Sequence, residues 1–132
     1  MIGVVLVSHA NIAKEMVEVI QHIVGPQENL ESISIFPKDD MENKRQEIIE
    51  SVKKVDSGKG VIVLTDMFGG TPSNLAISVM EDEKIEVVAG VNLPMLIKMM
   101  SVREKKNIKE IIKTSQESGR KYINVASAFF EE

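Results

Sequence analysis

A histidine and an aspartate stand just after two strongly apolar stretches of the sequence. His9 comes after the run Ile2–Val7, and Asp66 comes after the run Val61–Leu64. A carboxylate that accepts a hydrogen bond from one ring nitrogen of histidine fixes the tautomer and leaves the lone pair of the other nitrogen free. Because the ordinary pKa of histidine is about 6.5, that second nitrogen is a nucleophile near neutral pH. If the two stretches lie side by side, the pair predicts nucleophilic chemistry on His9.

A glycine-rich loop follows the aspartate and offers what a phosphoryl group requires. Gly69 and Gly70 allow close backbone approach, and Thr71 adds a hydroxyl at the start of a predicted helix. A helix N-terminus presents N–H donors and the positive end of its dipole to an anion. A second helix is expected directly after the histidine, so its N–H groups should face the same region. No Gly-x-x-x-x-Gly-Lys-Ser/Thr segment is present, so the phosphoryl donor is predicted to be a protein or a small phosphorylated molecule rather than a bound nucleotide.

Each of these residues also has a purely structural interpretation. A histidine after a strand is commonly a capping or solvated residue, Asp66 could cap the glycine turn, and Thr71 could be only the N-cap of its helix. Gly69 and Gly70 could serve turn geometry alone. The functional prediction depends on all of them falling at one edge of a sheet, outside the carboxyl ends of the strands, where ligands bind in open α/β folds.

Other clusters indicate structure rather than chemistry. His22 falls on a polar helix face, so a metal site built from the two histidines is not predicted. Met95, Met99 and Met100 have helical spacing and favour a core or subunit contact. We predict no metal ion and no organic cofactor.

The elements that must position these residues alternate between strand and helix. Apolar runs rich in β-branched residues predict buried strands at 2–7, 30–36, 61–64 and 85–89. Helices are predicted from residue 11 to the Gly25-Pro26 stop and at 41–55, 72–80, 93–100 and 108–118. The first should bury a stripe formed by Ile12, Met16, Val19, Ile20 and Ile23, the last should end at Gly119, and Tyr122–Val125 could add an edge strand. This order predicts an α/β fold with a doubly wound, mainly parallel sheet and helices on both faces.

The bulk composition limits the class of protein. A chain of 132 residues, 43% hydrophobic and 27% charged, matches one globular domain spanning residues 1–132. A net charge of −4 without a block of basic residues argues against a nucleic-acid partner. Cysteine is absent, which excludes disulfides, and no apolar stretch approaches the roughly 20 residues of a membrane-spanning helix. We therefore expect a cytoplasmic protein.

Three segments together resemble the mannose-family IIA components of the bacterial phosphoenolpyruvate-dependent sugar phosphotransferase system. They are Ser8-His9-Ala10, Leu64–Asn74 (LTDMFGGTPSN) and Ala89–Leu96 (AGVNLPML), in the order and spacing of that family. The resemblance implies a phosphotransferase in which His9 accepts a phosphoryl group from HPr and passes it to a IIB component. It implies that Asp66 orients the histidine and that Thr71 and Gly70 contact the phosphoryl group. Membrane IIC and IID components would be served indirectly during sugar uptake.

The resemblance also implies a homodimer that exchanges C-terminal strands, which would explain the apolar segment from Tyr122 to Phe130. The IIB component is expected to be a separate chain.

Three other functions remain as alternatives. The phosphoryl-carrying subunit of dihydroxyacetone kinase shares the fold and the histidine, but the loop after Asp66 resembles the sugar-transport group. A signalling receiver domain would carry the phosphoryl group on Asp66, yet it needs an acidic pair where this chain has Ser8-His9. A binding module without chemistry would leave His9 unmodified.

Overall fold

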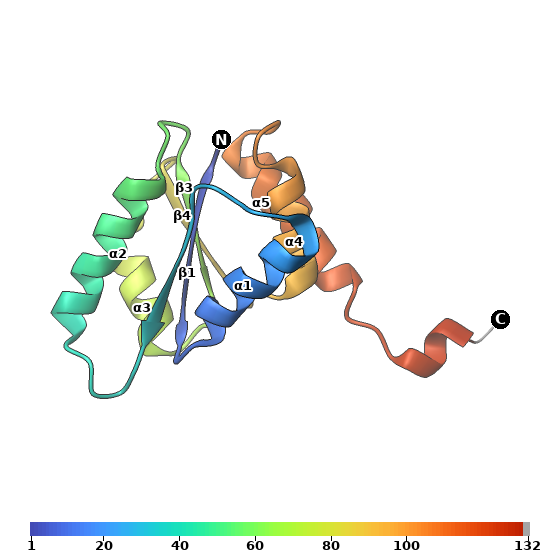
Figure 1. Cartoon of the computed structure of the whole chain (residues 1–132), viewed down its shortest axis with the longest axis horizontal. Coiled ribbons are helices and arrows are strands. Elements are labelled where there is room, and N and C mark those ends of the chain that lie inside the picture. The colour runs from blue at the N-terminus through green and yellow to red at the C-terminus, as the bar shows by residue number, and fades with distance from the viewer. Residues whose placement is uncertain (131–132) are drawn as a thin grey trace.

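The computed structural model describes residues 1–130, which alternate between strands and helices as the sequence predicts. The strands are β1 (Gly3–His9), β2 (Leu30–Ile35), β3 (Val61–Thr65) and β4 (Ile85–Ala89). Within these residues they form one parallel sheet in the order β2-β1-β3-β4 (Figure 1). The histidine ends the central strand β1, so the fold places it between the ends of β2 and β3.

Helices cover both faces of the sheet, which confirms the predicted doubly wound architecture. They are α1 (Ile12–Val24), α2 (Met41–Val55), α3 (Thr71–Ser78), α4 (Leu93–Val102) and α5 (Ile108–Lys121). Alternate residues of β1 face opposite sides, so Val4 and Leu6 pack with α1, α4 and α5, while Val5 and Val7 pack with α2 and α3. The three methionines of α4 are buried in the first of these cores. No helix within residues 1–130 is both long and apolar enough to cross a membrane.

The buried face of α1 differs from the predicted stripe. Ala13 and Ile20 are buried, whereas Ile12, Val19 and Ile23 are exposed. The prediction is right for Ile20 and for Met16, which is partly buried and packs against the same core, so the buried face is centred on Ala13, Met16 and Ile20. An apolar stripe on α1 is therefore left on the surface.

Gly119 does not end α5, which continues to Lys121. A Cβ atom at this glycine would lie 3.2 Å from Cβ of Met95 and 3.3 Å from Oδ1 of Asn92. The Asn92 side chain also donates a hydrogen bond to the Gly119 carbonyl at 2.9 Å. The glycine serves the close approach of α4 and α5 rather than a helix cap.

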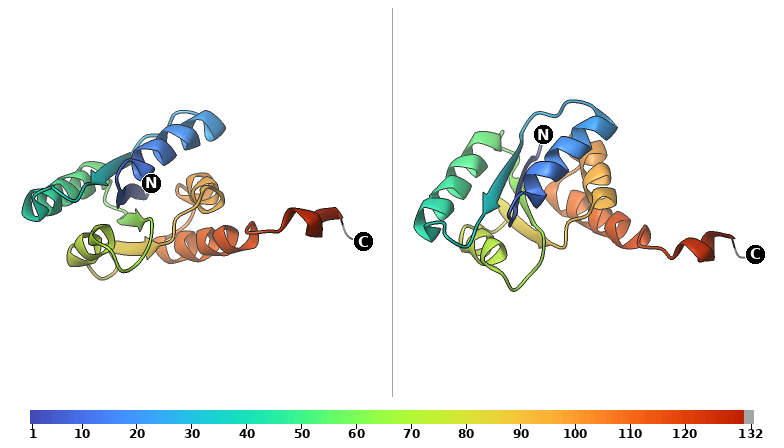
Figure 2. Two further views of the ribbon diagram at one scale, coloured as in Figure 1. Left: turned by 90° about the horizontal axis from the view of Figure 1, so that it is seen from below. Right: turned by 60° about the horizontal axis from the view of Figure 1, so that its bottom comes forward.

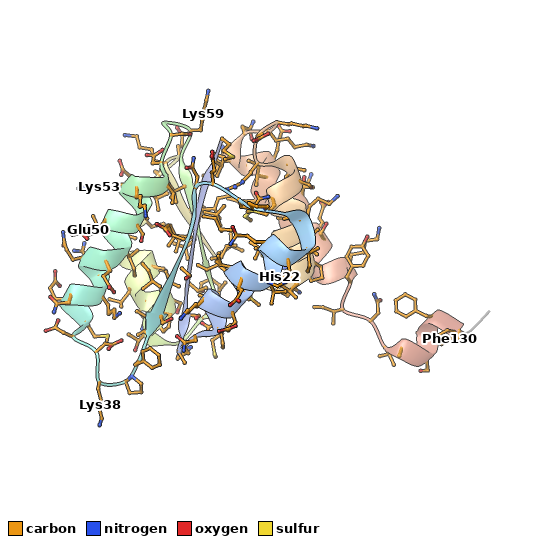
Figure 3. The ribbon with its side chains drawn as sticks, in the orientation of Figure 1. His22, Lys38, Glu50, Lys53, Lys59 and Phe130 are labelled. Carbon is orange, nitrogen blue, oxygen red and sulfur yellow. The ribbon has the colours of Figure 1, made fainter. Side chains whose placement is uncertain are left out.

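The C-terminal segment forms no strand within the described residues, so the expectation of an edge strand within this chain is wrong. Residues 122–125 are irregular, and Ala126–Phe130 is a short 3-10 helix. The segment leaves the body of the molecule in every view, with Phe130 at its far end (Figures 2 and 3). Its apolar side chains Tyr122, Ile123, Val125, Phe129 and Phe130 are exposed because nothing in this chain covers them among residues 1–130.

Candidate functional site

The end of β1 is fixed by its neighbours on both sides. His9 is paired with Ile35 of β2, and the Ala10 N–H donates to the Ile35 carbonyl at 2.9 Å. Ala10 has a φ of 48°, a left-handed conformation that turns the chain from β1 into α1. The buried Ser8 hydroxyl accepts a hydrogen bond from the Ala13 N–H at 2.7 Å, which secures the first turn of α1.

His9 and Asp66 meet at this edge of the sheet, as their sequence positions predict. Nδ1 of His9 lies 2.8 Å from Oδ2 of Asp66, and the same oxygen accepts the His9 backbone N–H at 2.9 Å. The histidine side chain is 48% exposed and that of the aspartate is 13% exposed. With a proton on Nδ1 shared with the carboxylate, Nε2 carries the lone pair and faces outward from the pair.

The Asp66 carboxyl has a pKa below its ordinary value. Partial burial pushes this pKa upward, but it is outweighed by the backbone and ring hydrogen bonds from His9 and by the attraction of the charged imidazole. The carboxylate is therefore ionised throughout the neutral range, as the orientation of a histidine requires.

Gly70 lies against the free side of the imidazole. A Cβ atom at this position would lie 2.6 Å from Cε1 and 2.8 Å from Nε2 of His9, closer than real contacts permit. Its φ of −128° is accessible to any residue, so the glycine is needed for its lack of a side chain. Any larger residue here would occupy the space next to Nε2.

Thr71 begins α3, immediately after that glycine, and is exposed. Its N–H belongs to the first turn of the helix, where N–H groups have no intrahelical acceptor. No hydrogen bond joins Thr71 to His9 in the part of the chain described. The threonine is therefore joined to the imidazole region through Gly70, and its side chain is exposed.

The N–H groups of α1 contribute less to this region than the sequence suggests, because that of Ala13 is bound to Ser8. Asn11 and Ser34 also belong to the edge: the Ser34 hydroxyl donates to Oδ1 of Asn11 at 3.0 Å. Neither was singled out from the sequence, and only the strand pairing, which sets Ser34 opposite Ser8, brings them there. Asn92 instead caps α4 by accepting the Met95 N–H at 3.0 Å.

Exposed apolar side chains occur in the segments that follow β1, β2 and β3. Ile12 is in the first turn of α1, Phe36 directly follows β2, and Met67 and Phe68 directly follow the aspartate. Because the imidazole is itself 48% exposed and these side chains are on the surface, this end of the sheet is suited to a protein partner more than to a small molecule.

Comparison with known proteins places this geometry in a family. A family model described as the PTS system fructose IIA component matches residues 3–116. The PTS system mannose-specific EIIAB component of Escherichia coli strain K12 is 31% identical over 129 residues, which are 96% of this chain and 40% of that protein. The chain thus spans about two fifths of the length of these EIIAB relatives.

Proteins of similar length match over nearly their whole extent. The PTS system fructose-specific EIIA component of Bacillus subtilis strain 168 is 29% identical over 133 residues, covering 100% of this chain and 91% of that one. The crystal structure of phosphotransferase system component EIIA from Streptococcus agalactiae superposes with a TM-score of 0.87 at 26% identity, covering 97% of this chain and 99% of the other. With the family model matching most of its length, the chain belongs to the mannose-type EIIA family of the phosphotransferase system.

Proposed function

We propose that this chain carries a phosphoryl group on Nε2 of His9, which it accepts from phospho-HPr and passes to a separate IIB component. The observation that supports this most directly is the pairing of His9 Nδ1 with Asp66 at 2.8 Å, which leaves Nε2 as the nucleophile. Membership of the EIIA family supports the choice of partners.

The proposed step is an in-line exchange between two histidines. The P–N bond to the donor imidazole breaks as a P–N bond to Nε2 forms, and the donor ring recovers its lone pair. The proton on Nδ1 stays between His9 and Asp66, where the carboxylate stabilises the positive charge that develops on the ring. Delivery to IIB is a second transfer of the same kind, in which the P–N bond to Nε2 breaks as a bond to the acceptor side chain of IIB forms, and Nε2 recovers its lone pair.

We assign stabilisation of the phosphoryl oxygens to the start of α3. The N–H and hydroxyl of Thr71 and the positive end of the helix dipole lie beside Gly70, whose missing side chain leaves room for the group. In this proposal no metal ion or cofactor takes part.

Protein partners suit the open surface around His9. The imidazole is 48% exposed, so a donor histidine on another protein can reach it without entering a pocket. We expect such a partner to cover the exposed apolar side chains that follow the three strand ends, Ile12, Phe36 and Met67. We place this exchange in the cytoplasm, with membrane IIC and IID components served only through IIB.

We also propose that the protein is a homodimer. Among the described residues β4 pairs only with β3, so its other edge is free, and a cavity of about 410 Å³ lies along it. The apolar segment Tyr122–Phe130 projects from its own body and is available to a second copy (Figure 2). Addition of a strand to a free edge is a common mode of protein association.

The first experiment is incubation with phosphoenolpyruvate, enzyme I and HPr, followed by intact-mass analysis under alkaline and acidic quench. We expect an HPr-dependent gain of one phosphoryl group that survives alkali and is lost in acid. His9→Ala should abolish the gain. His22→Ala is the matched control, because His22 is the second of the two histidines in the sequence and is exposed on α1.

Phosphorylation of the His9→Ala protein, or no gain in the folded wild type, would refute the proposal. If His22→Ala alone lost the gain in mass, the phosphorylated residue would be His22 on α1 rather than His9.

A further inference from the structure

Both backbone polar groups of Gly70 are bound by one buried side chain. The Ser73 hydroxyl donates to the Gly70 carbonyl at 3.0 Å and accepts the Gly70 N–H at 3.4 Å. Ser73 is 0% exposed. In a capping box the two side chains support each other, but here the N-cap is a glycine, so Ser73 supplies all the side-chain capping at this helix end.

The position of this glycine matters because it sets the space next to Nε2. A Cβ atom on Gly70 would lie 2.8 Å from that nitrogen. The Gly70 backbone therefore borders the space next to Nε2 that a phosphoryl group would fill. A displacement of the Gly70 peptide changes the distance between Nε2 of His9 and the N–H groups at the start of α3. Transfer reactions are sensitive to such displacements, which can cost roughly 10²-fold in rate for about 1 Å.

The loop before it makes few packing contacts. Gly69 has a φ of +87° and its Cβ position would meet nothing within 4 Å. Met67 and Phe68 are exposed, so they provide little packing in the free protein. The Gly70 carbonyl also accepts the Asn74 N–H at 3.1 Å, the first hydrogen bond of α3. The hydroxyl of Ser73 is the side-chain contact that adds to this bond and holds the Gly70 N–H as well.

We propose that Ser73 is a positioning residue for phosphoryl transfer, which holds the Gly70 peptide against His9 so that Nε2 and the N-terminus of α3 keep a fixed separation. This inference rests on the proposed function. Because Ser73 is fully buried, no partner protein can touch it, and its contribution must act on the maximal rate of transfer rather than on docking.

The test is single-turnover transfer from phospho-HPr to wild type, Ser73→Ala, Ser73→Thr and Ser115→Ala over a range of HPr concentrations. Ser115 is the matched control: it is 1% exposed, lies on α5, and its hydroxyl has no hydrogen-bond partner within the described part of the chain. Thermal unfolding establishes that each variant is folded. Two-bond ¹H–¹⁵N spectra of the His9 ring report its tautomer.

We expect Ser73→Ala to lower the maximal rate about tenfold or more with an unchanged KM and an unchanged His9 tautomer. Ser73→Thr, which keeps the hydroxyl, should restore most of the rate, and Ser115→Ala should match wild type. A wild-type maximal rate in folded Ser73→Ala, or an equal loss in Ser115→Ala, overturns the inference while leaving the carrier function in place. No transfer to wild type in the parallel reaction overturns both.

Discussion

The carboxylate of Asp66 accepts a backbone and a ring hydrogen bond from the same histidine, so one side chain controls both the place and the tautomer of the imidazole. Asp66→Asn keeps its size but can donate to Nδ1, which would favour the tautomer with the proton on Nε2. We expect the rate of phosphoryl acceptance to fall by about 10²-fold or more while the fold is retained. Single-turnover transfer with circular dichroism measures both, and an unchanged rate would refute the assigned role.

The depressed pKa of Asp66 predicts a pH dependence of stability. A carboxyl whose pKa is lower in the folded state contributes stability above its unfolded value of about 3.9, and this is lost as the pH falls through the folded value. The unfolding free energy of wild type relative to Asp66→Asn should therefore shrink as the pH falls below about 4. Urea unfolding at a series of pH values tests this, and a difference that instead grows in acid would contradict the sign.

Ala10 holds a left-handed conformation at the turn between β1 and α1. This conformation costs an L-residue about 1–2 kcal/mol, whereas glycine adopts it without strain. Glycine also makes the unfolded chain more flexible, which lowers the unfolding free energy by about 0.4–1 kcal/mol. Ala10→Gly should therefore raise the unfolding free energy by up to about 1 kcal/mol.

The control for this turn is Ala89→Gly in β4, where φ is not positive and glycine should cost about 0.5–1 kcal/mol. Equal losses in the two variants, measured by urea unfolding, would show that Ala10 is not strained.

Among individual residues, the pairing of His9 with Asp66 could be predicted because both stand at the carboxyl ends of buried parallel strands, which meet at one edge of the sheet. The contact of Gly70 with the imidazole and the support from Ser73 could not. They depend on how closely α3 packs on the sheet, which residue types in the loop do not encode.

At the scale of elements, α1 offers a direct comparison between two isoleucines. Ile20 is fully buried and Ile23 is 53% exposed, although hydrophobic spacing groups them on one face. Ile20→Ala should lower the unfolding free energy by about 2–5 kcal/mol, and Ile23→Ala by no more than about 0.5 kcal/mol. Urea unfolding of both variants tests this, and a large loss at Ile23 would show that its face is covered in solution.

The order and type of the elements could be predicted because apolar runs and amphipathic periods differ clearly in this sequence. The buried faces and the ends of the helices were harder to predict. Ala13 carries little hydrophobic signal yet marks the buried side of α1, and Gly119 suggests a helix end while serving the contact of α5 with Met95. In both cases a small residue is selected by close packing, which periodicity does not reveal.

For the molecule as a whole, the projecting C-terminal segment predicts self-association. Ile123 and Val125 are 74% and 71% exposed, so aspartate at both should block exchange without disturbing the core. We expect wild type to be a dimer by light scattering, with a Tm that rises with protein concentration, and the double variant to be a monomer with a concentration-independent Tm. A monomeric wild type at all concentrations would refute the dimer.

The parallel sheet gives the molecule two opposite ends, and His9 lies at the end formed by the carboxyl termini of the strands. Lys59 lies in the turn before β3, at the opposite end of the molecule from Lys38, which lies beyond the carboxyl end of β2 (Figure 3). The length of β1, Gly3–His9, sets these ends about 20 Å apart. A fluorophore or a surface tether attached at Lys59 would therefore leave the His9 end unobstructed. This turn is suited to single-molecule measurements of the association and dissociation of protein partners.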